Sequence, residues 1–275
     1  MLTKRAARTL AALAAATVAT VAVAEDAKPI QDNSFLVEEA YNQEPGVIQH
    51  ISLFTRDRDT GNWVFAFTEE WPAFGQTHQA SVTVQGLRTS AGTENVTGFG
   101  DVMLNYRWQA VGSGDTAVAF APRLSVLIPS GDSKRNLGLG GAGLQMNLPI
   151  STVLSEHFVA HSNLGGTWIP AARTADASGP SFGMNVGQSL IFLAHHNVNL
   201  MLEAAYSTME LDAPGGAQRV ETFFVSPGVR GALDFSFGLQ IVGGVAVPIG
   251  VGPSAGSLGI LGYLSFEHPI TKNAI

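Results

Sequence analysis

The chain has 275 residues, no cysteine and a formal net charge of −7. Charged residues make up 13% of it, well below the roughly 25% that is usual for soluble domains, and 31 residues are glycine. Without cysteine the chain can form neither a disulfide framework nor a thiolate metal site, and its acidic balance argues against nucleic acid as a partner. Low charge together with abundant glycine indicates many turns and a surface that does not face water everywhere.

Residues 1–24 have the three parts of a secretory signal peptide. Lys4, Arg5 and Arg8 give a positive start, residues 10–23 are apolar and uncharged, and small residues precede Glu25. A membrane-anchoring helix is the weaker alternative, because the run is shorter than the roughly 20 residues that a spanning helix requires. We therefore expect export of a mature chain beginning near Glu25, and the loss of three positive charges changes its formal charge from −7 to −10.

Residues 25–45 differ from everything that follows them. Within them, residues 33–43 could form a short helix that Pro45 and Gly46 end. The segment has two interpretations that the sequence leaves open. It is either a lead-in on the periplasmic side of a membrane or a plug that enters a barrel.

From residue 46 onward, apolar and polar residues alternate with a period of two. In the clearest example, Val102, Leu104, Tyr106 and Trp108 share one face of a segment. Such alternation over roughly 9–11 residues is typical of strands that cross a membrane at a tilt. Twelve strands are predicted, an even number as in bacterial single-chain barrels: 47–54, 62–69, 77–85, 98–110, 116–128, 139–150, 157–168, 182–193, 198–208, 220–232, 237–249 and 258–267.

The gaps between these segments alternate between two kinds. One set is long and polar or rich in glycine and proline: 55–61, 86–97, 129–138, 169–181, 209–219 and 250–257. The other set is shorter: 70–76, 111–115, 151–156, 194–197 and 233–236. Outer-membrane barrels sort their loops in this way, with the tight turns on the periplasmic side.

The predicted fold class is therefore all-β. We expect an antiparallel transmembrane β-barrel of about 12 strands over residues 46–268, preceded by a short helical segment and followed by a tail, residues 269–275. A second hypothesis is a soluble secreted β-sandwich that binds a ligand or partner. In that case another sheet would cover the outward apolar rows.

Polar and charged side chains fall on the less apolar face of the predicted strands. Turning an Arg or Lys outward would place it against lipid, at a cost of roughly 2–4 kcal/mol near the midplane. We expect the following residues to line the lumen: Asp101, Asn105, Arg107, Arg123, Glu203 and Arg230. They either form a polar track or gate for a solute, or pair with one another and fill a narrow barrel.

We find no motif that carries catalytic or metal chemistry. His195 and His196 lie in a predicted tight turn, where adjacent side chains diverge. Residues 138–143 (GLGGAG) lack the lysine of a phosphate-binding loop, and no GxSxG nucleophile motif is present. The acidic pairs at residues 38–39 and 69–70 are expected to be solvated or at a rim. We predict no catalytic residue, cofactor or metal; a barrel enzyme acting on lipids is the remaining alternative.

Three blocks of the sequence resemble a known family. DNSFLVEEAYNQEPGVIQHISLF (residues 32–54), GFGDV (98–102) and SPGVR (226–230) are similar to blocks of the family labelled "meta-pathway of phenol degradation", which is described as outer-membrane transporters. The resemblance implies an outer-membrane barrel involved in uptake of hydrophobic or aromatic compounds, not an enzyme. In one departure from many outer-membrane barrels, the chain continues past Phe266 to Ile275 instead of ending on an aromatic residue of the last strand.

The leading functional hypothesis is a monomeric channel or transporter in the Gram-negative outer membrane. Its expected surroundings are membrane lipids, and its expected solutes are small hydrophobic or aromatic compounds. The alternation, the sorted loops and the resemblance all favour this interpretation.

Overall fold

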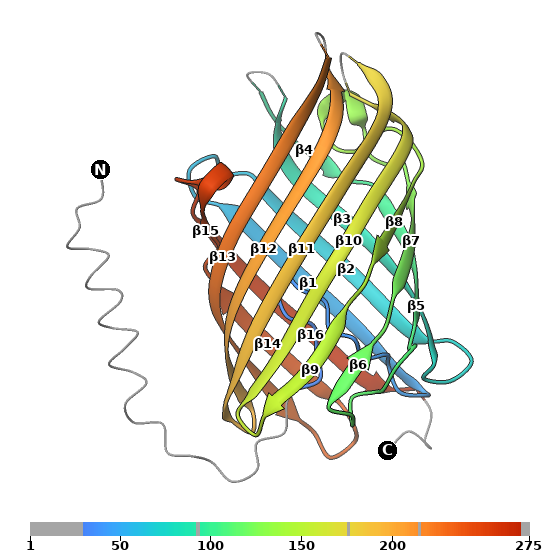
Figure 1. Cartoon of the computed structure of the whole chain (residues 1–275), viewed down its shortest axis with the longest axis vertical. Helices are drawn as coiled ribbons and strands as arrows, with labels where there is room; N and C mark the ends of the chain where they lie inside the picture. Colours follow the sequence, from blue (N-terminus) through green and yellow to red (C-terminus); the bar gives the residue numbers. More distant parts are fainter. Residues whose placement is uncertain (1–29, 92–93, 175–176, 214–215, 271–275) are drawn as a thin grey trace, which may run out of the picture.

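The computed structural model describes residues 30–270 except 92–93, 175–176 and 214–215. The predicted signal peptide (1–24), residues 25–29 and residues 271–275 of the tail lie outside the described residues. The strands form one antiparallel sheet, which closes into a barrel because β10 (Phe158–Arg173) pairs with β11 (Ser178–His195) (Figure 1). No helix among the described residues is long and apolar enough to cross a membrane.

The barrel wall has twelve strands, as the alternation predicts. Besides β10 and β11, six are continuous: β1 (Val47–Asp57), β2 (Trp63–Pro72), β3 (His78–Ala91), β12 (Val198–Ala213), β13 (Gly216–Asp234) and β16 (Gly259–Pro269). Four consist of two pieces each: β4 (Glu94–Phe99) with β5 (Val102–Trp108), β6 (Val118–Phe120) with β7 (Arg123–Ile128), β8 (Gly143–Asn147) with β9 (Ile150–Ser155), and β14 (Gln240–Ala246) with β15 (Ile249–Gly250). Two short 3-10 helices, η2 (Ser133–Arg135) and η3 (Gly252–Ser254), lie in loops.

Three of the interrupted strands were predicted as continuous segments, whereas the turn predicted at 151–156 is wrong because most of it belongs to β9. Proline explains three of the four interruptions. Pro122 lies between β6 and β7, Pro149 between β8 and β9, and Pro248 between β14 and β15. Proline has no N–H to donate to the ladder, so pairing is lost where it stands in a strand. The wall from β4 to β9 is consequently made of short pieces.

The strands β10 to β13 show the opposite deviation, because they are longer than predicted. They contain 16, 18, 16 and 19 residues, whereas a tilted strand crosses a membrane in roughly 9–11. Their upper ends in Figure 1 therefore rise beyond the neighbouring wall. The long loops predicted at 169–181 and 209–219 are wrong, since most of these residues belong to strands; 86–97 likewise contributes to β3 and β4. The glycine, proline and polar residues of these segments are typical of loops. Strands pair through backbone hydrogen bonds, however, and these do not require an apolar face.

The wall has apolar side chains outside and polar ones inside. Leu104, Leu124 and Leu202 point outward and are 44%, 50% and 51% exposed, whereas Glu203 and Arg230 are 0% and 1% exposed. Exposed apolar surface on this scale indicates contact with a membrane or partner. The β-sandwich alternative does not fit, because the described residues form one closed sheet and none forms a second sheet over the apolar rows.

Candidate functional site

A segment of the chain lies inside the barrel. Residues 30–46, which we call the collar, precede β1 and are mostly buried; Figure 1 shows them in blue in the lower half of the barrel. The helix predicted for residues 33–43 is wrong, because the collar consists of bends and irregular backbone. Its N–H groups find partners on the wall instead of within a helical turn, and these bonds satisfy the buried backbone.

Side chains around the wall accept the collar's N–H groups. The N–H groups of residues 36, 38 and 40 reach Glu203 on β12 (2.9 Å), Asn163 on β10 (2.7 Å) and Ser151 on β9 (2.8 Å). Those of residues 42 and 43 reach Gln109 after β5 (2.9 Å) and Gln79 on β3 (2.8 Å). The collar therefore runs around the inner circumference before it enters β1.

The start of the collar is held by Arg230 on β13. Its guanidinium donates to the carbonyls of Ile30 (2.9 Å), Asp32 (2.6 Å) and Asn33 (2.9 Å). The Asp32 carboxylate in turn accepts bonds from Tyr263 and Ser265 on β16. Burial raises the pKa of Asp32, although the nearby Arg230 acts in the opposite direction.

The end of the collar is held by Arg107 on β5. Its guanidinium donates to the Asn42 side chain (2.9 Å), to the Glu39 carbonyl (3.3 Å) and to the Tyr41 carbonyl. The Glu70 carboxylate lies 3.7 Å away. Arg107 and Arg230 thus hold the two ends of the collar mainly through its backbone.

Arg123 on β7 binds the collar differently, through the Glu38 side chain. Its Nε atom lies 3.1 Å and 2.9 Å from the two carboxylate oxygens of Glu38, and its Nη2 atom also donates to this carboxylate. Burial would raise the pKa of Glu38, but the Arg123 guanidinium outweighs it and holds the pKa below its ordinary value. Asn105 and Gln145 also accept bonds from the guanidinium, at 3.1 and 3.0 Å.

The remaining members of the predicted lumen set have distinct positions. Glu203 is fully buried and accepts a collar N–H, and Asn105 links Arg123 to Ser81 and Thr83 on β3. Asp101 lies between β4 and β5. Its carboxylate accepts the N–H groups of residues 131 (2.9 Å) and 139 (2.7 Å), so it organises a loop at the upper end.

The acidic pairs were predicted to be solvated or at a rim, but two of their members are buried. Glu39 is 2% and Glu70 is 6% exposed. Burial, followed by the neighbouring Asp32 carboxylate, raises the pKa of Glu39 well above its ordinary value. No sequence signal marks Glu39, because it becomes buried only when the wall closes around the collar.

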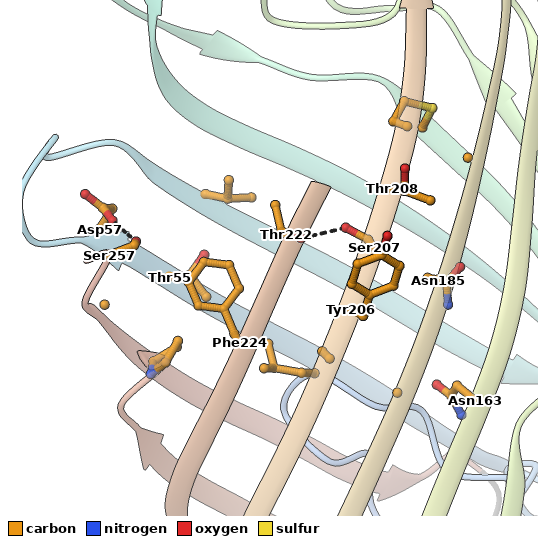
Figure 2. Close-up of a pocket in the computed structure, with 18 of the residues that line it drawn as sticks. Thr55, Asp57, Asn163, Asn185, Tyr206, Ser207, Thr208, Thr222, Phe224 and Ser257 are labelled. Carbon is orange, nitrogen blue, oxygen red and sulfur yellow. Dashed lines mark hydrogen bonds between the residues drawn. The ribbon is translucent and has the colours of Figure 1, made fainter. Parts of the chain in front are cut away.

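Above the collar lies a chamber of about 750 Å³. Its wall carries many hydroxyl and amide groups, including Thr55, Ser207, Thr222 and Asn185, together with the ring of Phe224 (Figure 2). Ser207 and Thr222 hydrogen-bond to each other at 2.7 Å across β12 and β13. The chamber can therefore receive a solute with both apolar and hydrogen-bonding groups.

A second cavity of about 230 Å³ lies beside the collar, and we call it the aperture. It is bounded on one side by collar residues 33–38 and on the other by inward side chains of β1, β2, β3 and β5. Three residues line both cavities: Leu36, Glu38 and Arg123. The Glu38–Arg123 ion pair therefore stands where the chamber meets the aperture.

Sequence reasoning missed the amide side chains that receive the collar. Gln79 on β3 and Asn163 on β10 accept collar N–H groups, and both are buried at inward positions of their strands. Buried amides need hydrogen-bond partners, so their number on inward faces predicts an enclosed backbone segment. That signal was available in the alternation pattern.

Comparisons with known proteins agree on the architecture. No family model matches the sequence, and no curated protein matches it. Among solved structures, an outer membrane channel from Pseudomonas putida F1 is 11% identical with a TM-score of 0.59, over 87% of this chain and 99% of that one. The NanC porin is 8% identical with a TM-score of 0.53, over 79% and 98%. Identities this low show the fold alone, which is that of outer-membrane barrels.

Proposed function

We propose that the protein is a monomeric channel of the Gram-negative outer membrane that admits small solutes with apolar or aromatic bodies. Solutes enter the chamber from the upper end and pass the collar through the aperture. The observation that carries this proposal is the pair of cavities inside an apolar-faced barrel, which meet at Leu36, Glu38 and Arg123.

The location in a membrane is supported by the outer surface. Exposed Leu, Val, Phe and Trp side chains cover it, and facing them toward water would be unfavourable. On that surface Ser162 and Gln188 satisfy each other by a 2.7 Å hydrogen bond between β10 and β11. Polar groups that face lipid need such internal partners.

The solute class and the family are supported by the blocks that carry the resemblance. The first block, 32–54, covers most of the collar and most of β1. The second, 98–102, contains Asp101, and the third, 226–230, ends on Arg230. Asp32 and Arg230, which belong to different blocks, contact each other inside the barrel. Together with Phe224 and Leu36 at the chamber, these features favour membership of the phenol-degradation family of transporters and an aromatic or apolar solute.

For the alternative of a lipid-modifying enzyme, the described residues offer one hydrogen-bonded pair of Ser and His side chains. Ser151 Oγ lies 2.7 Å from His161 Nδ1, but both residues are almost completely buried. Ser151 also accepts the N–H of Ala40, and the ring of Tyr41 lies against His161. The pair therefore anchors the collar, and we assign it no catalytic role.

Flux through the reconstituted protein tests the proposal. The protein is placed in liposomes, and entry of benzyl alcohol and of a small sugar is followed as the rate in excess of that into protein-free liposomes, because benzyl alcohol also crosses the bilayer itself. Ala66 lines the aperture, so A66W should reduce solute flux at least about tenfold by filling the passage. The control G262W adds the same side chain on β16 where no atom lies within 4 Å, and should leave flux unchanged. Wild-type protein that is folded but impermeable to every solute would refute the channel.

A disulfide tests whether solutes pass beside a stationary collar. A Cβ placed on Gly187 of β11 would lie 3.8 Å from the Cβ of Val37, which matches the mean separation in disulfides of about 3.8 Å. The chain has no native cysteine, so V37C/G187C can form one intramolecular bond. We expect oxidised and reduced forms to conduct equally. If flux appears only after reduction, the collar has to leave the wall.

A further inference from the structure

The three lumen arginines differ in what they bind on the collar. Arg107 and Arg230 donate mainly to backbone carbonyls, which no solute can replace without unfolding the collar. Arg123 instead binds a side-chain carboxylate, that of Glu38. A side chain can move away by rotation while the backbone stays in place. Arg123 is therefore the arginine whose collar partner can be exchanged.

The guanidinium of Arg123 is also held by partners other than Glu38. Asn105 and Gln145 accept its Nη1 and Nη2 groups at 3.1 and 3.0 Å, and both belong to the wall. A preorganised guanidinium is a favourable partner for a planar carboxylate, which it can bind through two parallel hydrogen bonds. The wall thus presents a carboxylate site that the chain fills with its own Glu38.

The site is also accessible to a solute. Both side chains line the chamber and the aperture, and the carboxylate side chain of Glu38 is 30% exposed. The guanidinium side chain is 12% exposed, so part of the desolvation has already occurred in the folded protein. Leu36 lies at the same junction and offers an apolar contact for the rest of a ligand.

From this geometry, and resting on the proposed channel function, we infer that the preferred solutes are small monocarboxylates with an apolar or aromatic body. The solute carboxylate takes the place of Glu38 on Arg123, and Glu38 turns away from the junction. A cationic solute would instead have to displace Arg123, which the wall holds at two amides. The Glu38–Arg123 pair therefore selects for anionic solutes, and the Glu38 carboxylate of the collar competes with the solute for Arg123.

Binding of 4-fluorobenzoate, followed by ¹⁹F NMR on the detergent-solubilised full-length protein, tests this inference. E38Q removes the competing charge, so we expect about tenfold tighter binding than in the wild type. R123Q should weaken binding about tenfold or more, and R123K should fall between R123Q and the wild type because it keeps the charge without the fork. The neutral analogue 4-fluorobenzyl alcohol should bind all variants within about twofold.

Arg219 on β13 provides the matched control. It forms the same kind of ion pair with Glu210, but its side chain is 60% exposed and lies on the long hairpin away from the cavities. R219Q should bind 4-fluorobenzoate like the wild type. Circular dichroism of every variant establishes that the barrel is folded.

Two outcomes would overturn the inference: R123Q binding 4-fluorobenzoate as tightly as the wild type, or E38Q binding it more weakly. Flux separates this failure from failure of the channel itself. If the protein speeds entry of benzyl alcohol or of the small sugar above that into protein-free liposomes while neither substitution changes carboxylate binding, the channel stands and the carboxylate preference is wrong. If no solute crosses through wild type or E38Q, the proposed function is wrong.

Discussion

The lower and upper halves of the lumen differ in their side chains and in how much space these leave. In the lower half, Arg107 and Arg230 are almost completely buried, and their donors are bound to collar carbonyls and wall amides. In the upper half, Thr, Ser and Asn side chains surround an open chamber. Arg123 lies at the boundary with Glu38 as its partner. Buried arginines therefore hold the collar backbone in the lower half, whereas the partner of Arg123 at the boundary is a side chain that a solute can replace.

Docking of the collar can be measured with a single introduced thiol. Ala40 belongs to the collar and is 0% exposed, and the chain has no cysteine of its own. In A40C protein, the rate of maleimide labelling therefore reports the fraction of molecules in which the collar has left the wall. The effect of a further substitution is the change in this labelling rate relative to A40C alone.

The largest effect is expected from R230Q. It removes the cation that holds three collar carbonyls, and it leaves Asp32 buried without its charged neighbour. Breaking a buried charged contact by removing one partner typically costs about 3–5 kcal/mol. Labelling should therefore rise about a hundredfold or more. R219Q, which removes an exposed arginine, should change it less than about threefold. Equal labelling of both variants would mean that Arg230 does not hold the collar.

A smaller effect is expected where the collar packs against glycine. A Cβ on Gly244 of β14 would lie 2.4 Å from the ring of Phe35, whereas at Gly243 nothing lies within 4 Å. Overpacking of this kind costs about 1–3 kcal/mol. G244A should therefore increase A40C labelling about tenfold, and the neighbouring G243A, which points outward, should not. If the two variants label alike, Phe35 is not seated against the wall.

The barrel could be predicted from the sequence, but the collar's structure could not. Period-two alternation depends only on which face meets lipid, so segments such as 102–108 predict their strand directly. The helix prediction for 33–43 failed for a physical reason. A helix prediction considers only the hydrogen bonds that a segment can form within itself. The collar's N–H groups instead bind Glu203, Asn163 and Ser151, which are more than a hundred residues away in the sequence.

The candidate site was predicted in part. Arg107, Arg123, Glu203 and Arg230 were identified as lumen residues because charge on a strand that faces lipid is costly. The structure gives all four of them collar partners. Those partners were not identifiable, because the collar carries no alternation that would indicate which side chains face the wall. Glu38 was consequently predicted to be solvated or at a rim, although it is central to the proposed site.

The smallest effect is a pH dependence of docking. Burial and the Asp32 carboxylate raise the pKa of Glu39, and Arg107 and Arg230 oppose this less strongly. Docking therefore takes up a proton at Glu39 at pH values between the ordinary carboxyl pKa and the raised one. Docking is strongest below that range and weakens as pH rises through it. Glu38 acts in the opposite sense: its lowered pKa gives a contribution that is complete above the ordinary pKa and is lost as pH falls through the lowered one.

A40C labelling, corrected for the pH dependence of the thiol with an exposed reference cysteine, should thus increase from pH 5 to pH 8. For a single proton, the increase is at most about tenfold per pH unit. E39Q should flatten the dependence, because the amide has no proton to lose. E44Q changes an exposed glutamate of the same segment and should leave the pH dependence of labelling unchanged. A profile that E39Q leaves unaltered would mean that Glu39 is not the group whose protonation controls docking.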